Sequence, residues 1–548
     1  MKTYRNISVA VGTLAVIFIA GCTKLDQNLN SALTNTQAAN ALGANGTALL
    51  LQTAYTDIGN PFSDPGNIFA LEEVTTDECL VPTRGGDWDD NGKWRALHQH
   101  AWSVDGVDVI LNQFNALNKI NFDATNVLAF KPTTAQAAEA RFIRALSLYQ
   151  LLNLYGQFPF RNPGDNLLNA PKVYSGDSAI NFIISELTTV LPQINASNAI
   201  YQANPDAARV LLMKCYLNKG AFLKRETPSF ADADMQQVIT LGNAVLNNPK
   251  YKYNANYFDN FSRDNGSKST EGIFAYQNAS GVTVGNSGIH NRWWATLHYN
   301  QGLPGAIGGW NGFSTVADFY STFGVAKATT QTPADTALDQ RLGGRFYNGS
   351  TNISGLRPGI LIGQQYDANN TPLKDRKNNP LSYTPAISND LKETGANLEI
   401  TGLRAVKYVP DYSSNNGNYG DNKAGNWLML FRYADVALMV AEAKMRATTT
   451  DMPGALKLVN DLRAARGAEA LTTMTLADPN NVYAPSTLLA ERGRELYWEA
   501  TRRTDLIRFG MFTKPWAYKA ASNAKYLVFP IPTQALAANP NLKQNNSY

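Results

Sequence analysis

The segment at residues 87–92 carries the densest set of ligand-binding side chains, Asp-Trp-Asp-Asp-Asn-Gly. It matches the first six positions of a calcium-binding loop, which needs oxygen ligands at alternate residues and glycine at a sharp turn. The twelfth position, where a bidentate glutamate should close the shell, is His98. A polar turn without a ligand is one alternative, but a tryptophan beside carboxylate and amide groups favours a neutral polar ligand such as a sugar. The candidate residues here are Arg84, Asp87, Trp88, Asp89 and Asn91.

A second group of aromatic residues lies between positions 293 and 310, among Gly, Asn and Gln. Most aromatic side chains belong to a hydrophobic core, so burial is the competing interpretation. Aromatic residues in a glycine-rich and asparagine-rich segment have less core to enter, and as a set they could form a stacking platform. The candidate residues are Trp293, Trp294, Tyr299 and Trp310.

Carboxylates recur every four residues at Glu491, Glu495 and Glu499. Like charges at this spacing repel on a helix, so each needs a cation, and we predict a hydrogen-bonded ion network. A glycosidase places its two carboxylates about 5–10 Å apart across a cleft, which neighbours on one helix face cannot do. The cations nearest in sequence are Arg494, Arg502, Arg503 and Arg508.

Motifs of common enzymes are absent from the sequence. There is no phosphate-binding loop, no Gly-x-Ser-x-Gly and no His-Glu-x-x-His, and His98 and His100 fall on alternate faces, which suits a metal poorly. We therefore predict no catalytic residue, no cofactor and no bound metal. The acidic residues at 72, 73, 77 and 78 leave a surface glycoside hydrolase or lyase as an alternative. The formal net charge of +4 gives no indication of nucleic-acid binding.

The N-terminus has the layout of an export signal. Lys2 and Arg5 precede an apolar stretch that ends in Ile-Ala-Gly-Cys at 19–22, and this stretch is too short to span a bilayer. Small residues directly before a cysteine resemble the bacterial lipobox, so we predict a signal peptide at 1–21 and lipidation of Cys22. A plain signal peptide is the alternative. Cys79 and Cys215 then remain, as two buried thiols or one bridge.

Helical periodicity dominates the chain outside its central third. Apolar residues recur at helical spacing over 133–156, and further helices are expected at 178–191, 205–223 and 234–247, with Asp177, Asn204 or Asp232 as N-caps. Residues 250–426 are rich in Gly, Asn and Tyr, and helical spacing returns over 427–447, 453–466 and 486–509. Paired helices joined by short turns predict a helical-repeat scaffold, and a central segment of this length is usually functional or forms its own irregular subdomain.

Four motifs resemble those of the SusD/RagB-like outer-membrane lipoproteins of Bacteroidetes nutrient-uptake systems. The first runs from Ala138 to Pro159, the second from Phe431 to Ala443, the third from Glu491 to Arg508, and the fourth covers the tail from Pro530 to Asn545. Ala535 and Gly493 depart from the family pattern, as does the ending Asn-Asn-Ser-Tyr at 545–548. With the lipobox, these motifs span nearly the whole chain in the order found in the family.

The resemblance implies an all-α fold, with about four tetratricopeptide-like helix pairs and a loop-rich subdomain packed on them. It implies a non-enzymatic, cell-surface lipoprotein of the outer membrane that captures an oligosaccharide or polysaccharide and delivers it to a SusC-like TonB-dependent transporter barrel. Peptide uptake through the same system is the alternative. The expected divisions are 1–21 for the signal peptide, 22–250 for N-terminal helices, 251–426 for the ligand-facing subdomain and 427–548 for C-terminal helices and tail.

Overall fold

The computed structural model describes residues 45–279, 287–302, 308–325, 337–343, 357–367, 369–411 and 424–548. The chain divides by its contacts into Met1–Gly46 and Thr47–Tyr548. The signal peptide and Cys22 lie outside the described residues, so both stay predictions. Because 47–548 forms one compact unit, the boundaries expected at 250 and 426 also stay predictions.

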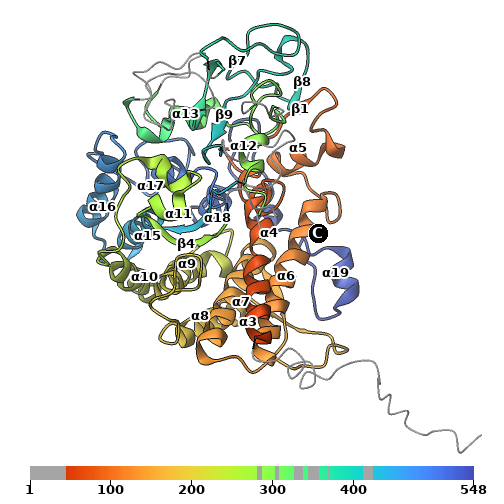
Figure 1. The fold of residues 1–548 in the computed structure, drawn as a ribbon, viewed down its shortest axis with the longest axis vertical. Coiled ribbons are helices and arrows are strands. Elements are labelled where there is room, and N and C mark those ends of the chain that lie inside the picture. Colours follow the sequence, from red (N-terminus) through yellow and green to blue (C-terminus); the bar gives the residue numbers. More distant parts are fainter. Residues whose placement is uncertain are drawn as a thin grey trace, which may run out of the picture. The chain divides into compact units, whose positions relative to one another are not determined.

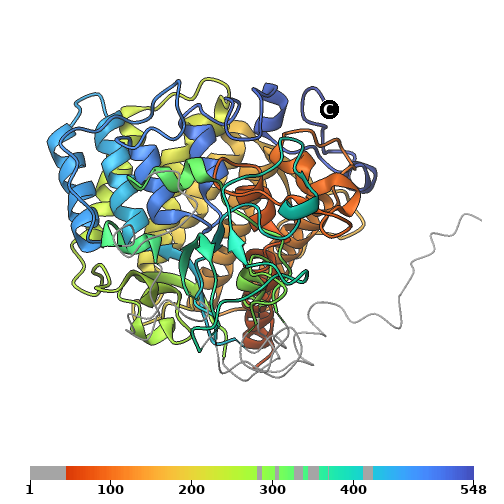
Figure 2. The same ribbon diagram turned by 90° about the horizontal axis from the view of Figure 1, so that it is seen from above.

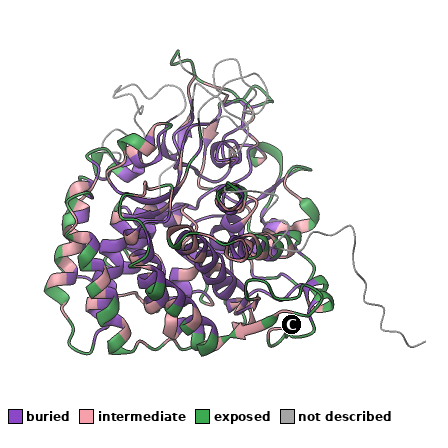
Figure 3. Cartoon of the chain, turned by 60° about the horizontal axis from the view of Figure 1, so that its bottom comes forward, coloured by how far each residue is buried: buried purple, intermediate pink, exposed green. Residues whose placement is uncertain are grey.

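The scaffold is a series of helices in which each packs against the next along the chain (Figure 1). The contacts run from α6 to α10, continue to α15 and end at α16, which confirms the predicted helical-repeat fold. Figure 3 shows the helices purple towards the interior and green outward. These helices are α6 (Asp108–Ala129), α7 (Thr134–Tyr155), α8 (Gly176–Val190), α9 (Pro205–Leu223), α10 (Asp232–Leu246), α15 (Tyr433–Arg446) and α16 (Met452–Ala465).

Local sequence sets the ends of these helices. Thr133 caps α7 in a reciprocal capping box with Gln136, and Gly156 ends it at φ 72°, a left-handed conformation that favours glycine. Asn204 caps α9 as predicted. The caps expected at Asp177 and Asp232 are wrong, because α8 and α10 each begin earlier, after Ser175 and Ala231.

The described residues between 251 and 411 form short strands, turns and short helices, which Figure 2 shows gathered on one side of the long helices. All five sheets among the described residues have two strands. The antiparallel pairs are β2 (Gln157–Phe160) with β3 (Lys172–Ser175), β4 (Gly272–Tyr276) with β10 (Leu428–Arg432), β5 (Gly359–Leu361) with β9 (Arg404–Val406), and β6 (Gly363–Gln364) with β7 (Ser382–Tyr383); β1 (Thr83–Arg84) and β8 (Lys392–Glu393) are parallel.

Shorter helices complete the unit and connect these sheets to the scaffold. They are α3 (Gly46–Thr56), α4 (Gly59–Ser63), α5 (Lys93–His98), α11 (Asn265–Lys268), α12 (Asn291–Trp294), α13 (Ala317–Ser321), α17 (Leu488–Leu496), α18 (Arg502–Arg508) and α19 (Thr533–Ala538), together with a π-helical turn at Ala70–Val74 and 3₁₀ turns at Asp90–Gly92, Tyr257–Phe261, Gln340–Leu342, Gly395–Asn397 and Ala524–Leu527.

Two helices expected near the C-terminus are shorter than predicted. The run at 427–447 begins as strand β10 and becomes helical only at Tyr433. The run at 486–509 breaks into α17 and α18, because Trp498 and Ala500 adopt positive φ values of 59°. Glu499 therefore does not lie on the same helix as Glu491 and Glu495.

The predicted ion network exists, but most of its cations come from elsewhere in the chain. Glu495 is fully buried and contacts Arg466 at 2.9 Å, Arg432 at 3.0 Å and Arg341 at 3.3 Å. Burial opposes the charged form of Glu495, but these guanidinium groups lower its pKa to about 2. Of the cations nearest in sequence, Arg494 pairs with Glu491 at 2.6 Å. Arg502 and Arg508 pair with other carboxylates, at Asp77, Glu442 and Asp505.

Two cysteines and two of the histidines in this unit are buried. Cys79 and Cys215 are buried free thiols, which confirms that interpretation over a disulfide. His98 and His100 are buried and hydrogen-bond to carbonyls of residues 79 and 75 at 3.1 and 2.9 Å. No group of three or more His, Cys, Asp or Glu among the described residues is arranged to hold a metal ion.

Candidate functional site

The two segments predicted to bind ligand lie against each other. Tyr299 donates its hydroxyl hydrogen to Asp87 Oδ2 at 2.5 Å, and the Trp88 indole N–H donates to the carbonyl of Trp310 at 2.7 Å. Backbone hydrogen bonds join the halves of the second segment, because Trp310 N–H donates to Trp294 O at 2.7 Å and Asn311 N–H to Leu297 O at 2.8 Å. Residues more than 200 positions apart thus form one surface, which we call the Trp88 surface.

The loop that carries Trp88 has an unusual backbone. It leaves β1 through a tight turn in which Arg84 and Asp87 exchange backbone hydrogen bonds of 2.9 and 3.1 Å. Trp88, Asp90 and Asn91 then adopt φ values of 60°, 39° and 55°. Left-handed conformations are costly for non-glycine residues and cluster at functional sites, where the surrounding structure holds them. Asp87, Asp90 and Asn91 of this loop are exposed.

Arg84 serves the structure beneath this surface instead of the ligand. Only 2% of the residue is exposed. It donates to the carbonyls of Asn311 at 2.7 Å and Thr401 at 2.8 Å. Burial, and then the nearby Arg404 guanidinium, hold the pKa of Arg84 well below its usual range. We therefore remove Arg84 from the ligand-contacting set and assign it to positioning β1 against 311–314.

Trp88 is held in place but keeps part of its side chain exposed. Its ring makes edge contacts with Trp94 and Phe313 at centroid distances of 5.6 and 5.5 Å. Gly312 lies directly beneath, since an added Cβ there would stand 2.3 Å from the indole. Trp88 and Trp310 are both partly buried residues packed on the core. A fixed, half-exposed aromatic ring is suited to stacking on a ligand, because little side-chain freedom is lost on binding.

Tyr299 forms the other side of the surface with a residue that the sequence did not reveal. The Arg376 guanidinium lies 3.8 Å from the centre of the Tyr299 ring and forms an ion pair with Glu399 at 2.7 Å. Burial and the hydrogen bond to Asp87 raise the pKa of Tyr299, which keeps the hydroxyl a donor. Arg376 is 77 positions from Tyr299 in the sequence, and no motif marks it, so only the folded structure brings it to the site.

The structure corrects the prediction for Trp293 and Trp294. Both side chains are 0% exposed and belong to the hydrophobic core. The short helix α12 turns them inward. Arg292, the residue before Trp293 on this helix, donates a hydrogen bond to the carbonyl of Ser63 at 2.5 Å. Neither ring presents a face to a ligand, so the aromatic set reduces to Trp88, Tyr299 and Trp310.

The polar residues of the loop do not converge on a cation. Asp89 forms an ion pair with Arg95 at 2.8 Å, and Asp90 accepts a hydrogen bond from the Trp94 indole at 2.6 Å. Asp87 is engaged by Tyr299. The carboxylates of this calcium-like segment thus point to separate partners. Asp87 and Asn91 are exposed and Asp89 is half-buried, which leaves hydrogen-bonding groups beside the three rings.

The carboxylates that suggested an enzyme are buried. Glu72, Glu73, Asp77 and Glu78 are all 0% exposed. Arg502 binds Asp77 at 2.7 Å, and backbone N–H groups of Thr501 and Trp498 donate to Glu73 at 3.1 Å and Glu78 at 3.2 Å. A substrate could not reach these groups in this structure, which removes the observation that favoured a glycoside hydrolase.

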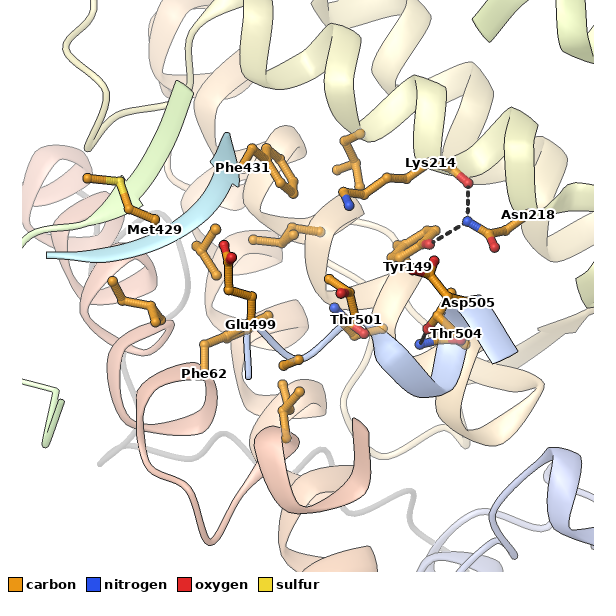
Figure 4. A pocket seen from close by; sticks show the side chains of 18 of the residues that line it. Phe62, Tyr149, Lys214, Asn218, Met429, Phe431, Glu499, Thr501, Thr504 and Asp505 are labelled. Atoms are coloured by element: carbon orange, nitrogen blue, oxygen red, sulfur yellow. Dashed lines mark hydrogen bonds between the residues drawn. The ribbon is translucent and has the colours of Figure 1, made fainter. Parts of the chain in front are cut away.

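A small internal cavity of about 70 Å³ lies between α7, α9, β10 and α18 (Figure 4). Lys214, Glu499 and Asp505 line it, and Asn218 donates to the Tyr149 hydroxyl at 3.1 Å beside it. Among the described residues, Gln150 Oε1, Asn153 Oδ1 and Arg492 Nη1 around it have no hydrogen-bond partner. The cavity is far below the roughly 300–1,000 Å³ of small-molecule pockets and suits ordered water.

Comparison with known proteins assigns the family. The sequence profile described as the SusD family matches residues 255–548, more than half of the chain. The chain belongs to the SusD family. It is 27% identical over 515 residues to the starch-binding protein SusD of Bacteroides thetaiotaomicron, covering 88% of this chain and 85% of that protein. The resemblance read from the four motifs is thereby confirmed.

Solved structures share the SusD fold. A SusD homolog from Bacteroides thetaiotaomicron superposes with a TM-score of 0.69 at 16% identity, covering 94% of this chain and 99% of the other. Surface glycan-binding protein A from the same organism, in complex with laminarihexaose, gives 0.64 at 15% identity, with 92% and 99% covered. At these identities the likeness establishes the fold alone. Within the described part of this SusD-family chain, no helix is both long and apolar enough to traverse a bilayer.

Proposed function

We propose that this chain is a lipid-anchored, cell-surface protein that binds an oligosaccharide or polysaccharide through the Trp88 surface, without catalysis. The observation that carries the proposal is the meeting of the segments that bear Trp88, Tyr299 and Trp310, with Asp87 and Asn91 exposed on the loop that carries Trp88. Sugar rings have apolar faces that stack on aromatic side chains and hydroxyls that pair with carboxylates and amides. The names of relatives that bind starch and laminarihexaose support this ligand class.

We further propose that the bound glycan passes to a SusC-like TonB-dependent transporter barrel in the outer membrane. Family membership supports this partner. A transfer protein needs modest affinity, because the ligand must leave for the barrel. A few stacking contacts and hydrogen bonds, each contributing about 0.5–1.5 kcal/mol, give micromolar binding. The predicted lipid on Cys22 would hold the protein at the membrane surface, and Cys22→Ser should release it from the membrane fraction of cells.

The test is binding of residues 23–548 to a panel of polysaccharides by gel retardation and calorimetry, with a peptide digest in parallel. We expect Trp88→Ala with Trp310→Ala to weaken binding of the retained glycan about tenfold or more, because two stacking contacts are lost. Phe122→Ala, which changes a 41% exposed aromatic residue on α6, should leave binding unchanged. Unaltered binding in the double tryptophan variant would refute the assignment of the Trp88 surface, and heat from peptides alone would favour the peptide-uptake alternative.

A further inference from the structure

A second cleft lies away from the Trp88 surface, between α3, the first turns of α7, the segment before α9 and the end of β4. Its volume is about 560 Å³, within the range of sites that hold small-molecule ligands. Phe274, Leu430 and Ile58 contribute apolar lining. In Figure 1 the elements that form it lie among the helices, below β1 and α5.

Three tyrosines from three different elements line this cleft, and contacts fix each ring. Tyr55 donates to Glu139 Oε2 at 2.6 Å and accepts from the backbone N–H of Ala203 at 2.8 Å. Tyr201 is 37% exposed and makes an edge contact with Trp427 at 5.5 Å. Tyr276 lies directly on Gly59, where an added Cβ would stand 2.6 Å from its ring. Rings fixed before binding lose little entropy when a ligand stacks on them.

The polar groups of the cleft are uncharged with one exception. Four amide side chains line it, and each offers both a hydrogen-bond donor and an acceptor. Glu139 is the sole charged residue of the lining. It is 8% exposed and accepts the Tyr55 hydrogen bond, and burial raises its pKa. The lining therefore gives no electrostatic preference for an ion. The four amides are those of Gln52, Gln136, Gln202 and Gln277.

We propose that this cleft is a second carbohydrate-binding site, which takes a neutral oligosaccharide by stacking on Tyr201 and Tyr276 and by hydrogen bonds to the glutamine amides. A ligand with apolar ring faces and many hydroxyls, but no charge, matches this combination of rigid phenol rings, amides and apolar floor. The proposal rests on the proposed function only for the class of ligand. A chain with two such sites would hold a long glycan at two points and so gain avidity.

The experiment is hydrogen–deuterium exchange of residues 23–548 with laminarihexaose and with maltohexaose as probes. Backbone segments report each site separately: 199–204 and 272–279 for the cleft, 84–95 and 298–311 for the Trp88 surface. We expect at least one probe to slow exchange at the cleft segments, and to do so also in the Trp88→Ala, Trp310→Ala background. If the probes protect the cleft segments of the unmodified protein but leave 84–95 and 298–311 unprotected, the result counts against the proposed function and the cleft assignment stands.

Variants then test the assignment within that background. Tyr201→Ala should raise the probe concentration for half-maximal protection of the cleft segments about 2- to 12-fold, as expected for one stacking contact. Gln277→Ala, at an exposed position that should not affect folding, should also raise it. Tyr216→Ala on α9 is the matched control and should not change it. Absence of protection at the cleft with both probes, equal protection in the Tyr201 and Gln277 variants, or protection by a peptide digest alone would overturn the proposal.

Discussion

Replacing Glu495 by glutamine tests whether the buried ion network holds the irregular region on the scaffold. Glu495 on α17 is 0% exposed and accepts from Arg341, Arg432 and Arg466, which come from three other segments. Glutamine has nearly the same shape but no charge, so it would leave these cations with fewer counter-charges in the interior. Removing one partner of a buried ion pair costs about 3–5 kcal/mol.

The pH dependence gives an independent measure of the same interaction. The pKa of Glu495 is lowered from 4.5 to about 2, which corresponds to about 3 kcal/mol. Because the folded pKa lies below the unfolded one, this stabilisation is present above about pH 4.5 and is lost as the pH falls towards 2. The variant should therefore differ most from the wild type near neutral pH and converge with it in acid.

The assay is urea unfolding of residues 23–548 at pH 7 and at the lowest pH where both proteins still fold. We expect Glu495→Gln to lower the free energy of unfolding by about 3–5 kcal/mol at pH 7. The control is Glu469→Gln, which makes the same change at an exposed glutamate. Its free energy of unfolding should stay within about 0.5 kcal/mol of the wild type. A loss below about 1 kcal/mol for Glu495→Gln, or a loss that does not shrink in acid, would refute the reasoning.

Two further substitutions test other parts of the fold. Burial and the adjacent Glu78 raise the pKa of Glu73 well above its usual value, and burial raises that of Glu78 to about 7. Because raised carboxyl pKa values make the folded state lose stability as the pH rises from about 4.5 towards 7, urea unfolding should show Glu73→Gln gaining stability relative to the wild type between pH 5 and pH 8. A difference that stays constant over this range would contradict the raised pKa of Glu73. An added Cβ at Gly242 on α10 would lie 2.2 Å from Val440 on α15, so Gly242→Ala should cost about 1–3 kcal/mol by overpacking, whereas Gly86→Ala, with no atom within 4 Å of the added carbon, should be neutral in the same assay.

The sequence predicts helices well where a single local rule decides them. Thr133, Asn204 and Gly156 act at the helix ends as their types indicate, because capping depends only on neighbouring backbone groups. The break between α17 and α18 escaped prediction, since Trp498 and Ala500 reach positive φ through tertiary packing and not through residue type. Helical periodicity likewise hid strand β10, whose pairing partner β4 lies more than 150 residues away in the sequence.

For the Trp88 surface, location was predictable and individual contacts were not. Residue types at 84–91 and 293–310 predicted a polar and aromatic site, and the fold brings these segments together. Composition could not separate Trp310, which keeps an exposed part, from Trp293 and Trp294, which are in the core. That distinction depends on which way the single turn of α12 faces. Arg376 could not be found at all, because its role arises only from its position over Tyr299.

The third family motif, at 491–508, is tied to the Trp88 surface by a short series of contacts. Arg502 binds Asp77 at 2.7 Å, and the N–H of Trp498 donates to Glu78. A few residues on, Leu80 exchanges backbone hydrogen bonds of 2.9 Å with Ser314. The motif thus anchors the segment that leads into β1.

That anchoring sets the spacing of the stacking rings. Arg84, at the end of the anchored segment, donates to Asn311, and Trp88 donates to Trp310, so the two ring-bearing loops are fixed to each other through the same backbone. Ordering a free side chain on binding costs about 0.5–1.5 kcal/mol, similar to what one stacking contact contributes. The proposed glycan site, built from three rings, therefore needs those rings already in place. In the proposed function, the buried Arg502–Asp77 ion pair of this motif thus helps to keep the three rings in place.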